Sequence, residues 1–252
     1  MNKRQQYNTQ VQSLTRGMQV LQLLARNGRM TASAIGAELG VHQSSASRLL
    51  RSLQDAGFVR KPDFHSFAID YGALLFAGVA MQGFAEIAAS AQAAMAVHAR
   101  TGYGAAAAVL RENRLIYLAH MGSAPQAAIR LIDDSTFPVH RSSLGLCLAA
   151  TAGPDTLRDT VLASCRRCDV RKPEAETRSI LAMVDDSLQR YDFVLLCDQA
   201  PNRFNGAMTF QTPRGPAAFA IYSDRQNARP DDVKRLLEDA VRQIAAALQP
   251  PP

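Results

Sequence analysis

The first forty residues contain two short patterns of apolar positions that are typical of amphipathic helices. In the first pattern the apolar side chains recur at the spacing of one helical face: Leu14, Met18, Leu21 and Leu24. Ser13 is the expected N-cap of this helix, and Gly28 is its expected end. Thr31 is the expected N-cap of a second, shorter helix, which ends at Gly40.

A third helix is predicted directly after Gly40-Val41, and its two sides differ. The apolar side consists of Ala46, Leu49, Leu50 and Leu53. At about 100° per residue, the opposite side consists of Ser44, Ser47, Arg48, Arg51 and Asp55. Two short helices joined this closely predict a helix-turn-helix, in which the third helix ends near Gly57.

The polar side of the third helix has the chemistry of a DNA-recognition helix. Small hydroxyl groups allow close approach to a groove, and Arg48 and Arg51 can contact guanine or the phosphate backbone. Serine is a poor helix former, so Ser44, Ser45 and Ser47 favour a role beyond helix formation. The alternative is an ordinary amphipathic helix whose polar side is solvated.

The residues after the third helix predict a β-hairpin with a basic tip. Two short alternating runs, 58–60 and 64–69, flank the turn residues Pro62-Asp63. Arg60, Lys61 and His65 lie at or near this tip. A basic hairpin directly after a helix-turn-helix is typical of a wing, which contacts phosphates or the adjacent minor groove.

The positive charge of the chain is concentrated in its first quarter. The whole chain has a formal net charge of +6. Residues 1–70 hold nine Lys and Arg against four Asp and Glu, a net charge of +5, whereas residues 71–252 have a net charge of +1. This asymmetry indicates an anionic partner for the first segment, either nucleic acid or a membrane surface. A solvated basic surface without such a partner is the alternative.

Composition excludes several classes of protein. In 252 residues, 47% are hydrophobic and 20% are charged, which suits a chain with a buried core. The longest apolar stretch, about 73–81, has less than half of the roughly 20 residues that a membrane helix needs. Residues 1–6 lack the apolar run of a signal peptide, so we expect a cytoplasmic protein with no membrane partner. Four cysteines are too few for a disulfide scaffold.

Residues 71–100 are rich in alanine, poor in charge and free of proline. They predict one long helix or two in series, broken at Gly78 or Gly83. A helix with so few charges needs to be covered on more than one side. Dimerisation and packing on the following domain explain this equally well.

The remaining residues alternate between strand and helix patterns. Strands are predicted at 103–110, 114–121, 127–132, 192–197, 205–211 and 217–222, and helices at 143–152, 154–164, 174–190 and 230–248. This order predicts an α+β domain around one mainly antiparallel sheet.

The polar residues of this second part do not form a recognisable catalytic motif. His140 lies near Ser142 and Ser143, but the Gly-x-Ser-x-Gly sequence of a nucleophile elbow is lacking. Residues 102–107 imitate a dinucleotide-binding motif, yet they follow a predicted helix and lack the acidic residue expected about 20 positions later. We therefore expect neither an enzyme nor a bound cofactor.

Cys165 and Cys168 have the spacing of metal ligands, but a structural zinc site needs about four ligands. The other cysteines and the five histidines show no second paired spacing, so we expect no metal. Nearby arginines, among them Arg166 and Arg167, could lower a thiol pKa, which leaves a redox role open.

Residues 13–70 resemble the IclR family of bacterial transcriptional regulators. The resemblance rests on Ser13-Leu14-x-Arg16-x-Met18-x-Val20-Leu21 and on the segment from Gly40 to Val59, which includes Gln43-Ser44-Ser45 and Ser47-Arg48. The family usually has Pro and Lys at the positions of His42 and Gln43, and often His at that of Ser47, so the resemblance implies the fold but does not define the operator sequence. The DNA contacts that we predict are Arg16, Gln43, Ser44, Ser45, Ser47, Arg48, Arg51, Arg60, Lys61 and His65.

The resemblance continues through Phe137–Gly145 and Arg190–Phe193, although the family usually has Gly at Arg190. It implies a winged helix-turn-helix domain at 1–70, a linker helix at 71–100 and a GAF-like effector-binding and oligomerisation domain at 101–252. It also implies a homodimer or a tetramer, which suits the reading of palindromic operators.

In relatives, the junction of a loop and the central helix holds a small carboxylate, opposite an acid, a cysteine and two serines. The resemblance places this junction at Ser142, Ser143 and Leu144, and the remaining positions at Val194 or Cys197-Asp198, Asn205, Ile221 and Ser223. Several polar contacts are replaced here, which favours a more apolar, aromatic ligand. A pocket without a ligand is the alternative.

The sequence thus predicts a DNA-binding transcriptional regulator, either repressor or activator, whose partners are a double-stranded operator, a small-molecule effector and further copies of itself. The effector would be a small organic acid or an aromatic metabolite. The alternative is a small-molecule-sensing or protein-interaction module whose basic N-terminal domain binds no specific operator.

Overall fold

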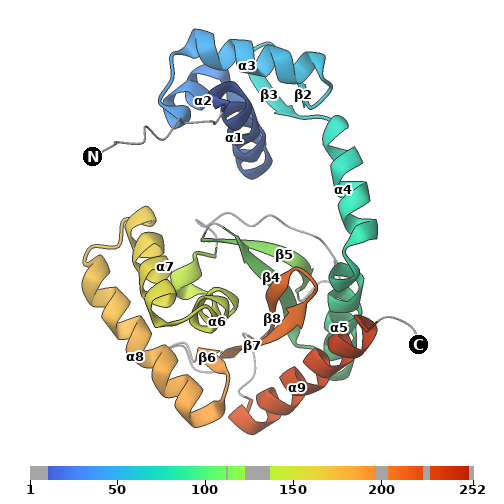
Figure 1. Ribbon diagram of the computed structural model, residues 1–252, viewed down its shortest axis with the longest axis vertical. Helices are drawn as coiled ribbons and strands as arrows, with labels where there is room; N and C mark the ends of the chain where they lie inside the picture. The colour runs from blue at the N-terminus through green and yellow to red at the C-terminus, as the bar shows by residue number, and fades with distance from the viewer. Residues whose placement is uncertain (1–10, 112, 123–136, 197–203, 224–227, 250–252) are drawn as a thin grey trace, which may run out of the picture. The chain divides into compact units, whose positions relative to one another are not determined.

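The computed structural model describes residues 11–111, 113–122, 137–196, 204–223 and 228–249 (Figure 1). The chain divides into two compact units, Met1–Gln82 and Gly83–Pro252. The division falls within the segment 71–100 that the sequence predicts as a linker.

The first unit contains the three predicted helices, α1 (Gln12–Asn27), α2 (Ala32–Leu39) and α3 (Gln43–Asp55). The Thr31 hydroxyl accepts a hydrogen bond from the Ala34 N–H at 3.2 Å, which confirms Thr31 as the N-cap of α2. Gly28 and Gly40 end their helices with positive φ angles of 74° and 63°, as predicted. The prediction that Ser13 caps α1 was wrong, because the helix starts two residues earlier than predicted and Val11 occupies the cap position.

The core of the first unit lies where the three helices meet. Its largest fully buried side chains are Val20, Leu24, Ile35, Leu50 and Val59. The predicted apolar face of α1 is only partly correct. Leu14 and Met18 are exposed, since the buried side of the helix follows Gly17, Val20, Leu23 and Leu24 instead.

The predicted hairpin is formed by β2 (Val59–Arg60) and β3 (Ser66–Ile69), in which Val59 pairs with Ile69 and Arg60 with Ala68. A third strand, β1 (Met30–Thr31), pairs with the other edge of β3. The sequence did not predict β1, because two residues are too short to show an alternating pattern. The resulting order β1-β3-β2 attaches the hairpin to the start of α2.

Residues 71–100 form two helices in series, α4 (Gly72–Gly83) and α5 (Ala85–Thr101). The break lies at Phe84, whose φ and ψ of −114° and 86° are not helical, one residue beyond the predicted Gly83. No residue of α4 is buried, whereas the inner side of α5 is. Within the described ranges no single helix is long and apolar enough to cross a membrane; only the bent pair α4 and α5 together reaches that length and composition.

The second unit is built on an antiparallel sheet with the strand order β5-β4-β8-β7-β6. Its strands are β4 (Gly104–Arg111), β5 (Arg114–Met121), β6 (Val194–Leu196), β7 (Phe204–Thr212) and β8 (Gly215–Ser223). These strands and the helices around them confirm the predicted α+β class. The strand predicted at 127–132 lies outside the described residues.

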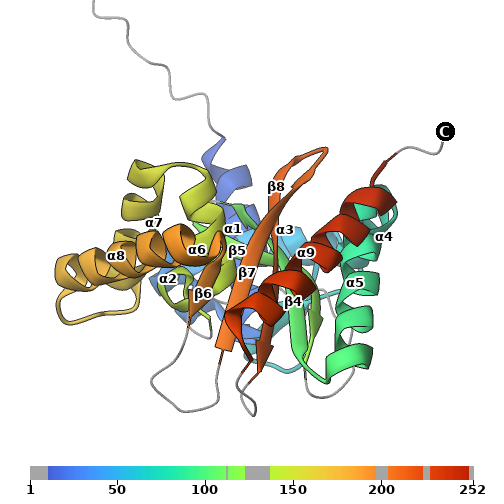
Figure 2. The ribbon, with the colours of Figure 1, turned by 90° about the horizontal axis from the view of Figure 1, so that it is seen from below.

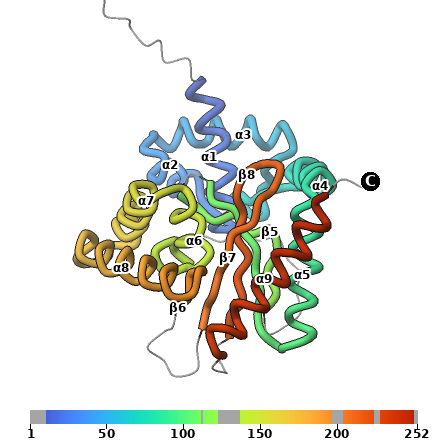
Figure 3. The backbone as a smooth tube through the Cα atoms, turned by 60° about the horizontal axis from the view of Figure 1, so that its bottom comes forward, coloured from blue at the N-terminus to red at the C-terminus, as the bar shows by residue number. Residues whose placement is uncertain are grey.

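Helices cover both faces of this sheet (Figures 1 and 2). On one face lie α5 and α9 (Pro230–Ala247); on the other lie the short 3-10 helix Val139–Arg141, α6 (Ser143–Thr151), α7 (Pro154–Arg167) and α8 (Pro173–Tyr191). The backbone trace in Figure 3 shows the sheet between these two layers. Because side chains alternate along a strand, Ala105 and Ala107 pack toward α5 and α9, and Ala106 and Ala108 pack toward α6.

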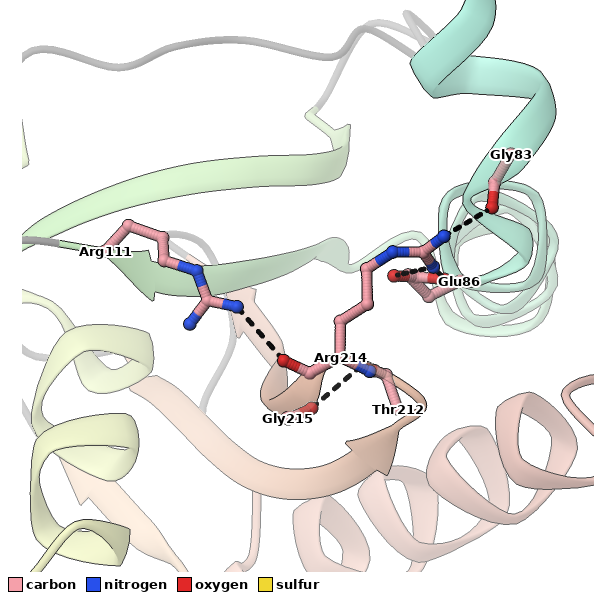
Figure 4. A network of polar contacts seen from close by, with 6 residues as sticks. All are labelled: Gly83, Glu86, Arg111, Thr212, Arg214 and Gly215. Carbon is pink, nitrogen blue, oxygen red and sulfur yellow. Dashed lines mark hydrogen bonds and ion pairs between the residues drawn. The ribbon is translucent and has the colours of Figure 1, made fainter.

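The turn between β7 and β8 fastens the beginning of α5 to the sheet (Figure 4). Arg214 in this turn donates hydrogen bonds to both carboxylate oxygens of Glu86, at 3.3 and 3.4 Å, and to the Gly83 carbonyl at 2.9 Å. Its guanidinium carbon also lies 4.1 Å from the centroid of the Phe84 ring. The Glu86 side chain is only 5% exposed, and the Arg214 guanidinium compensates the cost of burying its carboxylate. Arg111 of β4 donates to the Arg214 carbonyl at 3.1 Å and steadies the turn.

We expect Arg214→Ala to lower the free energy of unfolding by about 2 kcal/mol, because it leaves the buried Glu86 carboxylate without its hydrogen-bond donor. Denaturant unfolding of the full chain measures this loss, and hydrogen exchange locates it at the first turn of α5. Glu86→Gln in the same variant restores part of the stability, since a neutral amide tolerates burial better. Arg235→Ala, which removes an exposed ion pair with Asp232, is the matched control. An equal loss in that control would contradict the assignment.

Candidate nucleic-acid interface and ligand cavity

Helix α3 exposes the polar side that the sequence predicts. Gln43, Ser44, Arg48 and Arg51 are exposed, and Ser45 and Ser47 are half-buried, whereas Ala46 and Leu50 are buried. At the start of the helix the His42 ring acts as the N-cap: its Nδ1 accepts from the Ser44 N–H at 3.3 Å and lies 2.9 Å from the Ser44 hydroxyl. The position of the polar side of α3 is thus set locally, by a cap at the N-terminus of the helix and by burial of its apolar side.

The tip of the hairpin is held by Asp63. Its carboxylate accepts hydrogen bonds from the His65 N–H at 2.9 Å, from the Ser66 N–H at 2.7 Å and from the Ser66 hydroxyl. These hydrogen bonds hold the pKa of Asp63 below its usual value. The bond from the Ser66 hydroxyl has the largest effect, and the bonds from the two backbone N–H groups follow. This turn leaves Arg60, Lys61 and His65 exposed to solvent. The basic tip is therefore a fixed shape rather than a loose loop.

The hairpin and the start of α3 surround a common hollow of about 310 Å³. Gln43 and Ser47 from α3 and Lys61 and His65 from the hairpin line it, together with residues that the sequence analysis did not select: Thr31, Ala32, Ser33, Phe64 and Phe67. Hydroxyl, amide and cationic groups meet here around a space open to solvent. Such a set can bind the oxygens of a phosphate.

The other predicted DNA contacts do not line this hollow. Arg48, Arg51 and Arg60 are exposed, Ser44 and Ser45 lie in the first turn of α3, and Arg16 is half-buried on α1. Their contacts with DNA remain predictions.

The second unit contains a cavity of about 550 Å³. Five of the predicted effector residues line it: Ser142, Ser143, Leu144, Asn205 and Ser223. Ile221 does not, because it is fully buried on the opposite face of the sheet, in the core toward α5 and α9. Its neighbours in β8, Ala220 and Tyr222, line the cavity instead. Cys197 and Asp198 lie outside the described residues.

Polar contacts tie the loop-helix junction to the sheet. The Ser142 hydroxyl is the N-cap of α6 and accepts from the Gly145 N–H at 3.4 Å. The Ser143 hydroxyl donates to the amide oxygen of Asn205 in β7 at 2.5 Å. Ser143 is fully buried, so this bond satisfies a group that water does not reach. The start of α6 is thereby held in place at the cavity.

An aromatic wall faces this junction, and the sequence analysis missed it. The Tyr222 hydroxyl donates to the Met121 carbonyl at 3.0 Å and lies 3.0 Å from His120 Nε2. The His120 ring stacks on that of Tyr222 and meets that of Tyr117 edge-on. Burial raises the pKa of Tyr117 to about 12, against a hydrogen bond with Ser142 that lowers it, so its hydroxyl stays neutral. Alternation along β5 and β8 was the only signal for these residues.

Arg141 is the one side chain with a permanent charge among the described residues that line the cavity, and it is exposed to solvent. It directly precedes Ser142, the N-cap of α6. A cation beside the N-terminus of a helix favours an anionic group in the cavity.

His140 is a core residue in this structure. It is buried, and its Nδ1 lies 2.9 Å from the Ser164 hydroxyl of α7. Burial, and then the charge of Arg141, lower the pKa of His140 below its usual value. Ser142 and Ser143 are engaged with α6 and Asn205, so His140 activates neither of them.

Two of the described thiols, those of Cys147 and Cys165, are buried, whereas Cys168 is half-buried. Burial raises the pKa of Cys147 to about 12 and also raises that of Cys165. Among the described residues no group of three or more His, Cys, Asp or Glu side chains is arranged to hold a metal ion.

Comparison with known proteins gives a family match for part of the first unit and a shared fold for the whole chain. Residues 13–63 match the IclR helix-turn-helix domain. No curated protein matches the chain in sequence. Among solved structures, an IclR family transcriptional regulator from Brucella abortus superposes with a TM-score of 0.79 at 18% identity, covering 99% of this chain and 97% of that one.

Two further solved structures share the fold at low sequence identity. An IclR transcriptional regulator from Alicyclobacillus acidocaldarius has a TM-score of 0.68 at 21% identity and covers 95% of this chain and all of that one. An IclR homolog from Microbacterium hydrocarbonoxydans, complexed with 4-hydroxybenzoate, has a TM-score of 0.68 at 23% identity and covers 94% of this chain and 98% of that one. The family match confirms the predicted resemblance over residues 13–63, where the chain has an IclR helix-turn-helix domain, and the solved structures confirm the predicted fold.

Proposed function

We propose that this IclR-type chain binds an operator through α3 and the β2–β3 hairpin, and that a small molecule in the 550 Å³ cavity modulates this binding. The observation that carries the proposal is the shared hollow at the N-terminus of α3. There the exposed serine- and arginine-bearing side of a helix lies beside a rigid basic hairpin. An α-helix fits the major groove, and a hairpin beside it reaches the phosphates or the minor groove.

The chemistry of the cavity supports an aromatic or other small organic acid as the effector. Arg141 and the N-terminus of α6 suit a carboxylate, while Tyr117, His120 and Tyr222 suit a flat ring with a polar substituent. The Microbacterium homolog was solved with 4-hydroxybenzoate, a molecule with both features. The cavity volume is in the range of small-ligand sites.

Helix α4 supports self-association. Its large apolar side chains are exposed along its whole length: Leu74, Leu75, Phe76, Val79 and Met81. Exposed apolar patches of this kind favour a protein interface, and a second copy of the helix offers the same surface. A homodimer or tetramer would present two α3 helices to the two halves of an operator. Such a regulator acts where the DNA is, which in a bacterium is the cytoplasm.

We expect Arg48→Ala to weaken specific DNA binding by about 1–3 kcal/mol, because it removes a contact to a base edge. The measurement is a salt-titrated gel shift with a duplex selected by the wild-type protein from a random-sequence pool. Arg190→Ala, which removes an exposed charge paired with Asp186 in α8, should leave binding unchanged. If the wild-type protein selects no duplex, the chain is a sensing or interaction module and the operator proposal fails.

We expect 4-hydroxybenzoate to raise the melting temperature of the wild-type protein, because a ligand of the folded state stabilises it. Arg141→Gln should reduce this increase for the acid while leaving the response to neutral 4-hydroxybenzamide unchanged. Arg158→Gln, a charge removal on the outer side of α7, is the control. A screen of small aromatic and aliphatic acids by the same assay identifies the preferred class, and equal responses of both variants would contradict a role for Arg141.

We expect a charged residue on α4 to weaken self-association. Val79→Glu should shift the protein toward monomer in sedimentation velocity, because the carboxylate would be buried in an apolar interface. Met183→Glu places the same charge on a partly exposed position of α8 and serves as the control. An unchanged mass for Val79→Glu would show that α4 lies outside the interface.

A further inference from the structure

The wing tip carries an apolar side chain that the fold does not use. Phe64 is 83% exposed, the largest exposed fraction among the large hydrophobic residues of the described chain. It is absent from the buried core of its unit and from the partly buried residues packed against that core. Folding therefore gains little from a phenylalanine at this position.

The turn nevertheless holds this ring in a defined place. Asp63 accepts three hydrogen bonds from the two residues that follow Phe64, so the backbone on both sides of the ring is fixed. The His65 ring meets the Phe64 ring edge-on, with centroids 5.1 Å apart, and Lys61 Nζ lies 5.6 Å from its centroid. A rigid aromatic side chain loses little conformational entropy on contact with a partner.

The surroundings of Phe64 indicate which partner it meets. Phe64 lines the same hollow as Gln43 and Ser47, the residues at the start of α3. If α3 lies in the major groove, the hollow beside it receives the sugar-phosphate strand that separates the two grooves. The tip beyond the hollow then reaches the minor groove, and its cations Arg60 and Lys61 suit the negative potential there.

We infer that Phe64 is an apolar wedge that inserts into the minor groove at a base step flanking the site read by α3. This inference rests on the proposed operator binding. An inserted ring partly unstacks one step and kinks the duplex, and flexible pyrimidine–purine steps allow this at the lowest cost. Phe64 would then contribute specificity through the deformability of the DNA rather than through hydrogen bonds to its bases.

The test uses the duplex selected by the wild-type protein, with 2-aminopurine placed in turn at each flanking step. Wild-type protein should increase the fluorescence at one step in each half-site, because unstacking relieves quenching. Phe64→Ala should abolish this increase and weaken binding about tenfold, as expected for loss of one base–aromatic contact. Phe64→Leu, which keeps an apolar wedge, should retain part of both.

Two matched variants separate a wedge from other roles. Tyr71→Ala removes an aromatic ring of nearly equal exposure, 82%, outside the hollow, and should leave affinity and fluorescence unchanged. Lys61→Gln should reduce the dependence of affinity on salt by about one ion, whereas Phe64→Ala should leave that dependence unchanged. The melting temperature of Phe64→Ala should equal that of the wild type.

Several outcomes would overturn the inference. Unchanged affinity and fluorescence for Phe64→Ala would show that the ring does not meet the bases, and a lowered melting temperature or altered oligomer mass would assign it to the protein's own packing. Wild-type binding without any fluorescence change would remove the wedge and leave the operator proposal intact. Failure of the wild-type protein to select a duplex would instead remove the operator proposal itself.

Discussion

A buried carboxylate at the start of α5 depends on a cation from the β7–β8 turn, and this ion pair holds α5 against the sheet. Glu86 is almost inaccessible to water, and the cation that compensates it comes from Arg214, more than a hundred residues later in the chain. The same guanidinium also satisfies the carbonyl of Gly83, at the end of α4, where helices leave such groups without partners. One side chain therefore joins the β7–β8 turn to the point where the two compact units divide.

The cavity follows from the way the sheet separates its two faces. Residues with even numbers in β8, such as Ala220 and Tyr222, face the cavity, while Ile221 faces the core beneath α5 and α9. Gly104 makes this arrangement possible, because a Cβ atom at that position would overlap the Tyr222 ring. The cavity is lined by aromatic side chains and by Arg141. The hydrogen bond between Ser143 and Asn205 holds the start of α6 against the same face of the sheet.

Under the proposed function, the two units would bind their anions in opposite ways. The first unit spreads many cations over an exposed surface, where salt screens each of them, and this suits a long polyanion. The second unit places a single Arg141 beside a helix N-terminus and among aromatic rings, which suits one small anion with a flat apolar body. In the sequence, α4 lies between the basic residues of the first unit and the cavity residues of the second, and its exposed surface is apolar.

Local rules were enough to predict most of the helices and strands and the chemistry of their exposed residues. Helix caps at Thr31 and Gly40, the basic hairpin and the polar side of α3 all follow from contacts within a few residues, and the antiparallel sheet followed from alternating patterns. Features that depend on contacts between distant residues were visible only in the folded protein. Three of these features join segments far apart in the chain: the pairing of β1 with β3, the ion pair between Arg214 and Glu86, and the grouping of Tyr117 and His120 with Tyr222. A fourth, the burial of Val20 rather than Met18, depends on how α1 packs against its neighbours. A periodic pattern predicts that a side chain is buried, but it does not predict which distant residue the side chain contacts.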